Sequence, residues 1–317
     1  MASLMARVIR KVRRPFFIDH NNNLRGSVFL AGVGRSGTTW VSEIINYNDE
    51  YRYIFEPFHP HRVRAVQDFA YHQYLRPSNR DPRFLQPAGA ILSGRIRNKW
   101  TDTYNRKIFS KKRLIKDIRA NLMLKWLHDN YPEVPIVLMF RHPCAVANSW
   151  IKLGWERESL GTRTNIETCL SQPELVEDFL EPYLDHLDRA RDSFERNVFF
   201  WCIQNYVPLK QFHYGEIHLA FYEHFCDKPR DEISRLFHFL NKPFDEKVFA
   251  NLSRPSYLSS RTSAIRTGDD LIESWRKQVS PGQIQRALEI LKIFKLDRIY
   301  SQETMPDVHA AYEMLIE

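Results

Sequence analysis

Residues 27–46 bring glycines, hydroxyl side chains and one cation to a point where the chain changes from an apolar run to an amphipathic one. The apolar run ends at Gly32, a second glycine follows at Gly34, and helical spacing of apolar residues begins at Thr38. This order is typical of a buried strand, a tight turn and a helix. Glycines allow the N–H groups of the turn to face one point, and the new helix adds unpaired N–H groups and the positive end of its dipole. The segment therefore predicts a site for an anion such as a phosphate.

The nucleotide-binding pattern G-x-x-x-x-G-K-[ST] is matched in part by residues 32–39. Both glycines and the final threonine are present, but Thr38 stands where the lysine belongs, and the nearby cation is Arg35. A lysine that reaches the β- and γ-phosphates of ATP therefore has no equivalent, which argues against an ordinary NTPase. A strand-to-helix turn without a ligand is the alternative. The cation and the three hydroxyl side chains gathered at this turn favour a functional site.

Two motifs resemble those of the sulfotransferases that use 3′-phosphoadenosine 5′-phosphosulfate (PAPS). The first, at residues 35–40, reads RSGTTW and is similar to the family's 5′-phosphosulfate loop, [RK]-S-G-T-[TS]-[WFL]. The second is an apolar strand, 136–140, that is followed by Arg141 and, eight residues later, by Ser149. The resemblance implies that the first motif holds the 5′-phosphosulfate and that Arg141 and Ser149 hold the 3′-phosphate.

The resemblance implies further contacts with PAPS and its product, adenosine 3′,5′-bisphosphate, without a metal. Tyr222 ends a strand expected near 216–223, where the family has a tyrosine close to the adenine. Residues 259–268 stand where the family places a loop over the 3′-phosphate, with Arg261 as a reserve candidate there. The candidate cofactor-binding residues are Gly34, Arg35, Ser36, Gly37, Thr38, Thr39, Trp40, Arg141, Ser149, Tyr222, Arg266 and Gly268.

Glu56 is the candidate general base. It follows a short aromatic strand, 51–55, and the carboxyl ends of strands form the edge where open α/β sheets bind ligands. The carbohydrate and tyrosyl-protein members of the family carry a glutamate here that is taken to be the base, so the resemblance implies this role for Glu56. We expect its pKa to lie near 4.3, or higher if the site is desolvated. His59 and His61 are the nearest competing bases, and an exposed or salt-bridged loop glutamate is the alternative.

Lys116 lies in the strand expected at 113–117 and matches the lysine of the family's central strand. The phenol- and hydroxysteroid-type members read K-T-H at this place, with the histidine as base. Here Asp117 and Ile118 follow the lysine, and the absence of that histidine favours Glu56. We expect Lys116 to contact the transferring group or the acceptor, with an ordinary strand-end cation as the alternative. The catalytic candidates are Glu56, Lys116 and Arg35.

The chain is long enough, at 317 residues with 43% hydrophobic content, for one large α/β domain. Strands alternating with helices predict a single domain with a central parallel sheet of about five strands, flanked by helices on both sides in a P-loop-like arrangement. The resemblance implies that this is the sulfotransferase fold. We expect a basic N-terminal arm over 1–26 and a sulfotransferase domain over 27–317, with an insertion at 58–113 and a lid-like segment at 154–195. Apolar spacing also predicts helices over 63–74 and 174–184.

The net charge of +8 is concentrated in one segment. Residues 58–113 hold thirteen Lys and Arg against three Asp, a local charge of +10, which leaves −2 for the rest of the chain. Such a segment favours an anionic partner, whether cofactor phosphates, an acidic glycan or nucleic acid, although a charge run is more often a solvated face.

The four cysteines show no C-x-x-C spacing, which makes metal ligation or a disulfide scaffold improbable. No apolar run reaches the roughly eighteen residues of a membrane span and no cleavable leader follows Met1. These patterns predict a cytoplasmic protein.

The function predicted from these patterns is transfer of a sulfuryl group from PAPS to an acceptor hydroxyl, or to an amine, with a glycan or glycoconjugate favoured. A small-molecule natural product is the alternative acceptor. The rival classes are a P-loop nucleotide kinase or NTPase and a nucleic-acid-binding module. A kinase would need a strand-end aspartate for Mg²⁺, whereas the strand 136–140 is followed by Arg141. A nucleic-acid module would leave the two anion motifs without a role, so no nucleic-acid partner is expected.

Overall fold

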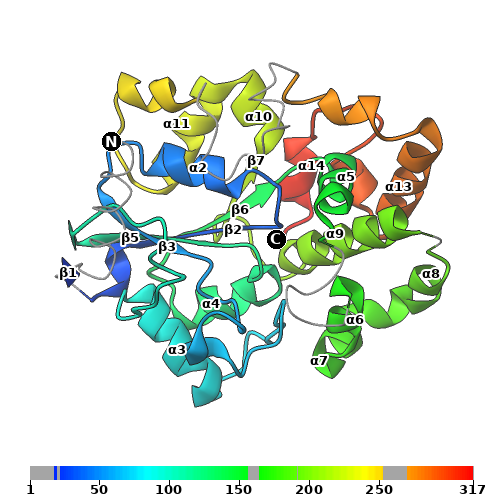
Figure 1. The fold of residues 1–317 in the computed structure, drawn as a ribbon. Helices are drawn as coiled ribbons and strands as arrows, with labels where there is room; N and C mark the ends of the chain where they lie inside the picture. The colour runs from blue at the N-terminus through cyan, green and yellow to red at the C-terminus, as the bar shows by residue number, and fades with distance from the viewer. Residues whose placement is uncertain (1–17, 20–21, 156–163, 191, 253–269, 317) are drawn as a thin grey trace, which may run out of the picture.

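The structure, a computed structural model, describes residues 18–19, 22–155, 164–190, 192–252 and 270–316. Its main sheet has five strands in the order β3-β5-β2-β6-β7, and every neighbouring pair is parallel (Figure 1). The strands are β2 (Ser27–Gly32), β3 (Tyr51–Phe55), β5 (Lys112–Asp117), β6 (Ile136–Phe140) and β7 (His218–Phe221). The expected parallel sheet is confirmed.

Helices cover both faces of the sheet because its strands are apolar on both sides. In β2, Val28 and Leu30 belong to one hydrophobic core, whereas Phe29 and Ala31 belong to the other. Helices α2 (Thr38–Ile45), α10 (Tyr222–Asp227) and α11 (Pro229–Phe239) lie on the first side, and α3 (Pro82–Leu92), α4 (Leu124–Asn130), α5 (Pro143–Leu153), α9 (Ser193–Leu209) and α13 (Pro281–Ile293) contribute to the second core (Figure 1). Among the residues described, no helix is long and apolar enough to cross a membrane.

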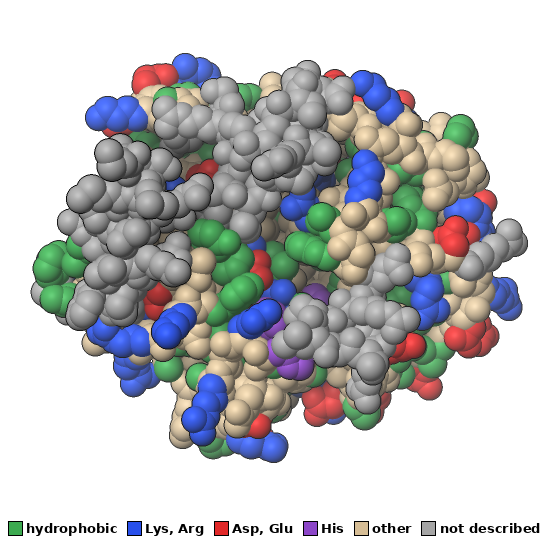
Figure 2. All heavy atoms as spheres, in the orientation of Figure 1, with side chains coloured by type: hydrophobic (Ala, Val, Ile, Leu, Met, Phe, Trp, Pro, Cys, Tyr) green, Lys and Arg blue, Asp and Glu red, His purple; other side chains and the backbone are tan. Residues whose placement is uncertain are grey.

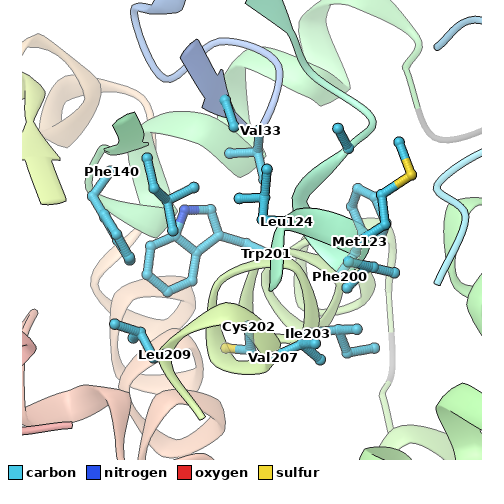
Figure 3. Close-up of a cluster of buried hydrophobic side chains, with 14 of the residues drawn as sticks. Val33, Met123, Leu124, Phe140, Phe200, Trp201, Cys202, Ile203, Val207 and Leu209 are labelled. Carbon is cyan, nitrogen blue, oxygen red and sulfur yellow. The ribbon is translucent and has the colours of Figure 1, made fainter. Parts of the chain in front are cut away.

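Helix α9 supports the carboxyl end of β6. Trp201 of this helix is completely buried and lies among apolar side chains that include Val33, Leu124 and Phe140 (Figure 3). Its indole Nε1 donates a hydrogen bond to the carbonyl oxygen of Arg141 at 3.1 Å. The apolar packing of α9 therefore fixes the position of a candidate cofactor-binding residue.

One predicted helix is wrong and another is irregular. The segment 174–184 is helical throughout, but as four consecutive pieces of different kinds, α7 (Pro173–Leu175), a π-helix η4 (Val176–Leu180), η5 (Glu181–Tyr183) and the start of α8 (Leu184–Asp188). Pro182 lacks the N–H that a continuous α-helix needs at that point. Within 63–74 only the 3₁₀ turn η2 (Arg64–Val66) forms, and His72 takes a left-handed backbone conformation with φ 62° that ends any helix.

The remaining elements are short or peripheral. They are β1 (Ile18–Asp19), β4 (Phe109–Ser110), α6 (Asn165–Leu170), α14 (Val308–Glu313) and the 3₁₀ turns η1 (Leu24–Gly26), η3 (Asn121–Met123), η6 (Glu246–Asn251), η7 (Ser274–Lys277) and η8 (Leu296–Arg298). Strands β1 and β4 pair in parallel as a separate two-stranded sheet. Ser280 caps α13 through a capping box with Gln283.

Two buried arginines tie the basic segment and the N-terminal region to the sheet. Arg113 of β5 donates from Nε to Asp19 Oδ2 at 2.7 Å and from Nη2 to Asp19 Oδ1 at 2.9 Å. Arg52 of β3, which is completely buried, donates from Nη2 to Asp102 Oδ1 at 2.9 Å and to the carbonyl of Ile96 at 2.6 Å. Part of the charge in this region is therefore structural. The boundaries of the arm, the insertion and the lid remain predictions.

Replacing Asp102 should destabilise the fold, because the buried Arg52 would lose the carboxylate at 2.9 Å and keep only that of Asp19 at 4.0 Å. We expect Asp102→Ala to lower the free energy of unfolding by about 3–5 kcal/mol, measured by urea denaturation. The matched control is Asp68→Ala, at an exposed aspartate of the same segment, which should change it by less than about 0.5 kcal/mol. Equal, small effects of both variants would show that the buried ion pair contributes little.

Candidate active site

The turn between β2 and α2 has the backbone of an anion site. Gly37 is the N-cap of α2, with φ 96°, and no side chain caps the first N–H groups of the helix. A Cβ at Gly37 would lie 2.6 Å from Cδ2 of Tyr222, and one at Gly32 would lie 2.8 Å from Cβ of Met139. Both positions therefore require glycine, and the amino end of α2 is left open for a negatively charged group.

Side chains brace this turn from within and from α5. The Ser36 hydroxyl is buried and donates to the carbonyl of Val33 at 2.7 Å, and Trp150 Nε1 donates to the carbonyl of Gly34 at 3.0 Å. Thr38 is buried and Thr39 is half-buried in the first turn of α2. Since the Ser36 hydroxyl and N–H both donate to the Val33 carbonyl, the N–H groups of residues 37–39 and the hydroxyls of Thr38 and Thr39 are the donors of the turn available to a ligand.

Arg35 and Arg141 meet at this turn. Arg35 has a left-handed backbone, φ 74°, and its Nε donates to Ser149 Oγ at 3.0 Å. Arg141 Nη1 donates to the carbonyl of Arg35 at 3.2 Å. Burial and the neighbouring Arg141 guanidinium lower the pKa of Arg35. Neither arginine forms an ion pair with a carboxylate in the described part of the chain, although the buried Glu223 interacts with the Arg141 charge without forming one, so this pair of cations has no direct counter-ion.

Aromatic rings enclose the two arginines. The Arg141 guanidinium lies 3.9 Å from the ring centroid of Tyr222, and the Trp40 ring packs edge-on to the same tyrosine with centroids 5.6 Å apart. Arg141 Nε and Trp40 Nε1 are buried N–H groups without a hydrogen-bond partner among the described residues. Two orphaned donors beside an open helix terminus fit an anionic ligand that also has an aromatic base.

Glu56 lies between two cations at the ends of β3 and β5. Its Oε1 accepts from Lys116 Nζ at 2.7 Å, and its Oε2 accepts from Arg119 Nη1 at 2.7 Å. All three residues are buried. The strand register explains the meeting, because Phe55 pairs with Lys116 and the Glu56 N–H donates to the Lys116 carbonyl at 2.7 Å. The two predicted catalytic residues Glu56 and Lys116 are thus in direct contact.

The expected pKa of Glu56 is wrong. Burial alone would raise it, but the charges and hydrogen bonds of Lys116 and Arg119 lower the pKa of Glu56 to about 2. The opposing cations outweigh desolvation because both contact the carboxylate directly. Glu56 is therefore ionised at any working pH.

Sequence reasoning missed Arg119 and Asp117. Arg119 holds one oxygen of Glu56, and its guanidinium lies 4.8 Å from the ring centroid of Tyr71. Asp117 accepts hydrogen bonds from the backbone N–H groups of Phe58 and Arg119, both at 2.8 Å. The only signal was their place just at the end of β5, since the contacts join loops about sixty residues apart.

Histidine and tryptophan side chains surround Glu56. Trp100 Nε1 donates to the carbonyl of Glu56 at 3.1 Å, and the buried His59 ring packs against Trp100 with centroids 5.4 Å apart. Burial, followed by the Arg119 charge, lowers the pKa of His59 to about 3, so its ring is neutral. His61 is exposed and stacks on Tyr71. Of the two competing histidines, His59 is therefore the one packed into the Glu56 cluster.

The turn between β2 and α2 lies next to the Glu56 cluster, which consists of Glu56, Lys116 and Arg119. A Cβ at Gly34 would lie 3.3 Å from Ile118 Cδ1 and 3.0 Å from Cζ3 of Trp155. Figure 2 shows basic and histidine side chains around a recess near the centre of the face in view.

Arg266, Gly268 and Arg261 lie outside the described residues. No group of three or more His, Cys, Asp or Glu among the residues described is placed to hold a metal ion.

The family is shown by a sequence match. Residues 25–292 match the model of the sulfotransferase domain, so this chain belongs to the sulfotransferase family. The chain is 24% identical over 281 residues to the nodulation protein NoeE of Sinorhizobium fredii (strain NBRC 101917 / NGR234), a match covering 83% of this chain and 63% of that protein. The matched family is thus that of the sulfotransferases, and its model spans both the β2–α2 turn and Glu56.

Three solved structures align with this chain, each with a TM-score below 0.5. The sulfotransferase STF9 from Mycobacterium avium aligns with TM-score 0.47 and 10% identity, covering 90% of this chain and 79% of that one. The mouse sulfotransferase SULT7A1, solved with PAP, aligns with TM-score 0.45 and 13% identity, covering 89% and 88%. The sulfotransferase domain of the Synechococcus PCC 7002 olefin synthase aligns with TM-score 0.44 and 14% identity, covering 88% and 97%.

The lowered pKa of Glu56 predicts how stability depends on pH. A carboxylate whose folded pKa lies below its unfolded value stabilises the fold above the unfolded pKa, and this contribution is lost as the pH falls toward the folded pKa. For a shift from 4.5 to about 2, we expect Glu56→Gln to lose on the order of 3 kcal/mol at pH 7. The loss should shrink by roughly 1.4 kcal/mol for each pH unit below about 4.5. Urea unfolding of both proteins between pH 7 and 3.5 measures it, and a loss independent of pH would contradict the assigned ionisation.

Proposed function

We propose that this chain transfers the sulfuryl group of PAPS to an acceptor hydroxyl and releases adenosine 3′,5′-bisphosphate. The observation that carries the proposal is the meeting of Arg35 and Arg141 at the uncapped start of α2. Two neighbouring guanidiniums beside free helix N–H groups favour a ligand with more than one anionic group. A donor with a phosphosulfate at one end and a 3′-phosphate at the other has that distribution of charge.

The residues of the turn and of α5 would divide the donor between them. The N–H groups of residues 37–39 and the Arg35 guanidinium would hold the 5′-phosphosulfate, while Arg141 and Ser149 would hold the 3′-phosphate. Tyr222 and Trp40, which pack against each other beside Arg141, would contact the adenosine. When bound, PAPS supplies the activated sulfuryl group. By analogy with phosphoryl transfer, the protein's task is to hold the reactants in line and to neutralise charge on the leaving phosphate oxygen.

Glu56 would take the proton of the acceptor hydroxyl. A carboxylate with a pKa of about 2 is a weak base, but it is always ionised and needs no prior deprotonation. In a loose transition state the acceptor's proton is lost late, when the hydroxyl has become strongly acidic, so base strength matters less than position. Lys116, which touches Glu56, would orient the carboxylate and add positive charge near the transferring group.

A glycan or glycoconjugate acceptor, preferably an anionic one, suits the surroundings of Glu56. Trp100 contacts the Glu56 carbonyl through Nε1, and the exposed Arg62 places its guanidinium 5.5 Å from the Trp100 ring centroid. A cation therefore lies one side chain away from the candidate base. Aromatic rings offer a surface for sugars as well as for flat small molecules, and a small-molecule natural product is the second candidate acceptor.

Removing Arg141 should weaken the 3′-phosphate site alone. A charge-assisted hydrogen bond to a phosphate is worth about 1.5–3 kcal/mol, so Arg141→Ala should weaken binding of adenosine 3′,5′-bisphosphate by roughly tenfold or more. Ser149→Ala should have a smaller effect of the same kind. Binding of adenosine 5′-phosphosulfate, which lacks the 3′-phosphate, should hardly change.

Isothermal titration without Mg²⁺ measures both ligands, and Arg230→Ala is the control because Arg230 is an exposed arginine of α11. Equal weakening of the two ligands would move the 3′-phosphate site elsewhere. No binding of adenosine 3′,5′-bisphosphate to the unmodified protein would remove PAPS as the donor.

Replacing Glu56 should affect turnover and leave the donor site intact. Glu56→Gln keeps the shape of the side chain but cannot accept the proton, so turnover should fall on the order of a hundredfold or more. Affinity for adenosine 3′,5′-bisphosphate should stay the same. His59→Ala and His61→Ala should retain most activity. Near-full turnover of Glu56→Gln together with an inactive His59→Ala would make the histidine the base.

A further inference from the structure

Asp117 is a buried carboxylate that the transfer chemistry proposed above does not use. It ends β5, is completely buried, and forms no ion pair with any residue in the described ranges. Burying a carboxylate without a direct counter-ion is unfavourable unless other hydrogen bonds compensate. Its two oxygens receive such bonds from backbone N–H groups, Phe58 to Oδ2 and Arg119 to Oδ1, each at 2.8 Å. Both oxygens are thus committed to the backbone.

These two N–H groups belong to the loops that carry the Glu56 cluster. Phe58 closes the turn that starts at Glu56, and its ring packs in the core 6.1 Å from Phe29. Arg119 is itself the residue that holds Glu56 Oε2. A second bond, from the Glu56 N–H to the Lys116 carbonyl at 2.7 Å, joins the same two loops. The side chain of Asp117 therefore links the same two loops at the Phe58 end of the Glu56 turn, whereas the Glu56 N–H links them at its beginning.

The Glu56 turn needs such a cross-link because its backbone is strained. Glu56 has φ 43°, a left-handed conformation that a residue with a side chain rarely adopts and that persists only when the surroundings enforce it. The bonds at Glu56 N–H and Phe58 N–H hold the turn on its two sides. Without the bond to Asp117, the turn could relax and carry the Glu56 carboxylate away from Lys116 and Arg119.

We propose that Asp117 is a positioning residue that fixes the Glu56 carboxylate between Lys116 and Arg119 by holding their two loops together. The consequence for turnover rests on the proposed role of Glu56 as base, whereas the geometric claim stands by itself. Asp117 is not a second base, because its side chain is completely buried, whereas Glu56 keeps some exposed surface.

The test is Asp117→Asn in the full chain. Asparagine offers one carbonyl oxygen and one NH₂ group, so one of the two backbone N–H groups loses its acceptor. We expect turnover to fall by roughly tenfold or more, since small displacements of a catalytic group are costly, while affinity for adenosine 3′,5′-bisphosphate stays within about twofold. The carboxyl ¹³C resonance of Glu56, followed by NMR in a pH titration, should show a higher pKa than in the unmodified protein.

The control is Asp81→Asn, at an aspartate that likewise accepts the N–H two residues later, at the start of α3. It should change neither turnover nor the Glu56 titration. If Asp117→Asn does not fold, Asp117→Glu replaces it, because it keeps the charge and both oxygens but displaces them by one methylene. Folding of each variant is checked by its urea midpoint.

A double variant separates positioning from other roles. In the Glu56→Gln background, Asp117→Asn should lower turnover no further, because it acts through a carboxylate already removed. A full additional loss, an unchanged Glu56 titration, or near-full turnover of a folded Asp117 variant would each overturn the proposal. Full turnover of Glu56→Gln alone would instead overturn the assignment of the base, while the NMR titration would still decide whether Asp117 positions Glu56.

Discussion

Burial of the central strand between two parallel neighbours is the constraint on which the site depends. Strand β2 pairs with β5 on one side and β6 on the other, and helices cover both faces. Its backbone groups are used in the sheet and its side chains in the two cores, so polar chemistry can occur only where the strands end. Parallel pairing brings those ends to one edge. The turn after β2, Arg141 after β6 and the Glu56–Lys116 contact at β3 and β5 all lie there for this reason.

The charged side chains at this edge form two groups that differ in their ratio of cations to carboxylates. At the β2–α2 turn, Arg35 and Arg141 lie together and neither forms an ion pair with a described carboxylate, a state that burial makes unfavourable and that an anionic ligand would relieve. At the Glu56 cluster two cations share one carboxylate. The β2–α2 turn suits a negatively charged ligand, whereas the Glu56 cluster already contains a carboxylate. This asymmetry supports assigning the donor to the turn and the acceptor to the Glu56 side.

The sequence predicted the sheet well because most strands are compact apolar runs bounded by polar or breaking residues, with β5, in which four of six residues are charged, as the exception. Strands 51–55 and 136–140 begin and end as expected. The contact of Glu56 with Lys116 was implied only by their common edge, and the partner Arg119 was not foreseen, since such pairs depend on the register of strands far apart in the chain. The pKa of Glu56 was wrong for the same reason: desolvation can be guessed from a sequence, but the cations that oppose it cannot. The helix expected at 174–184 forms but is irregular, because Pro182 interrupts the hydrogen bonds of a regular α-helix, and the one expected at 63–74 does not form.

Strain is concentrated where chemistry is expected. Arg35 and Glu56, one on each side of the site, both have left-handed backbones with φ of 74° and 43°, which turn their side chains away from the path a regular loop would give them. Each is held by bonds from a neighbouring element: Arg35 through its carbonyl to Arg141 and its Nε to Ser149, Glu56 through its N–H to Lys116. The hydrophobic core stabilises this arrangement, because α9 and Phe58 anchor the elements that supply those bonds. The apolar packing far from the reacting groups is therefore what keeps two charged side chains in conformations they would not adopt alone.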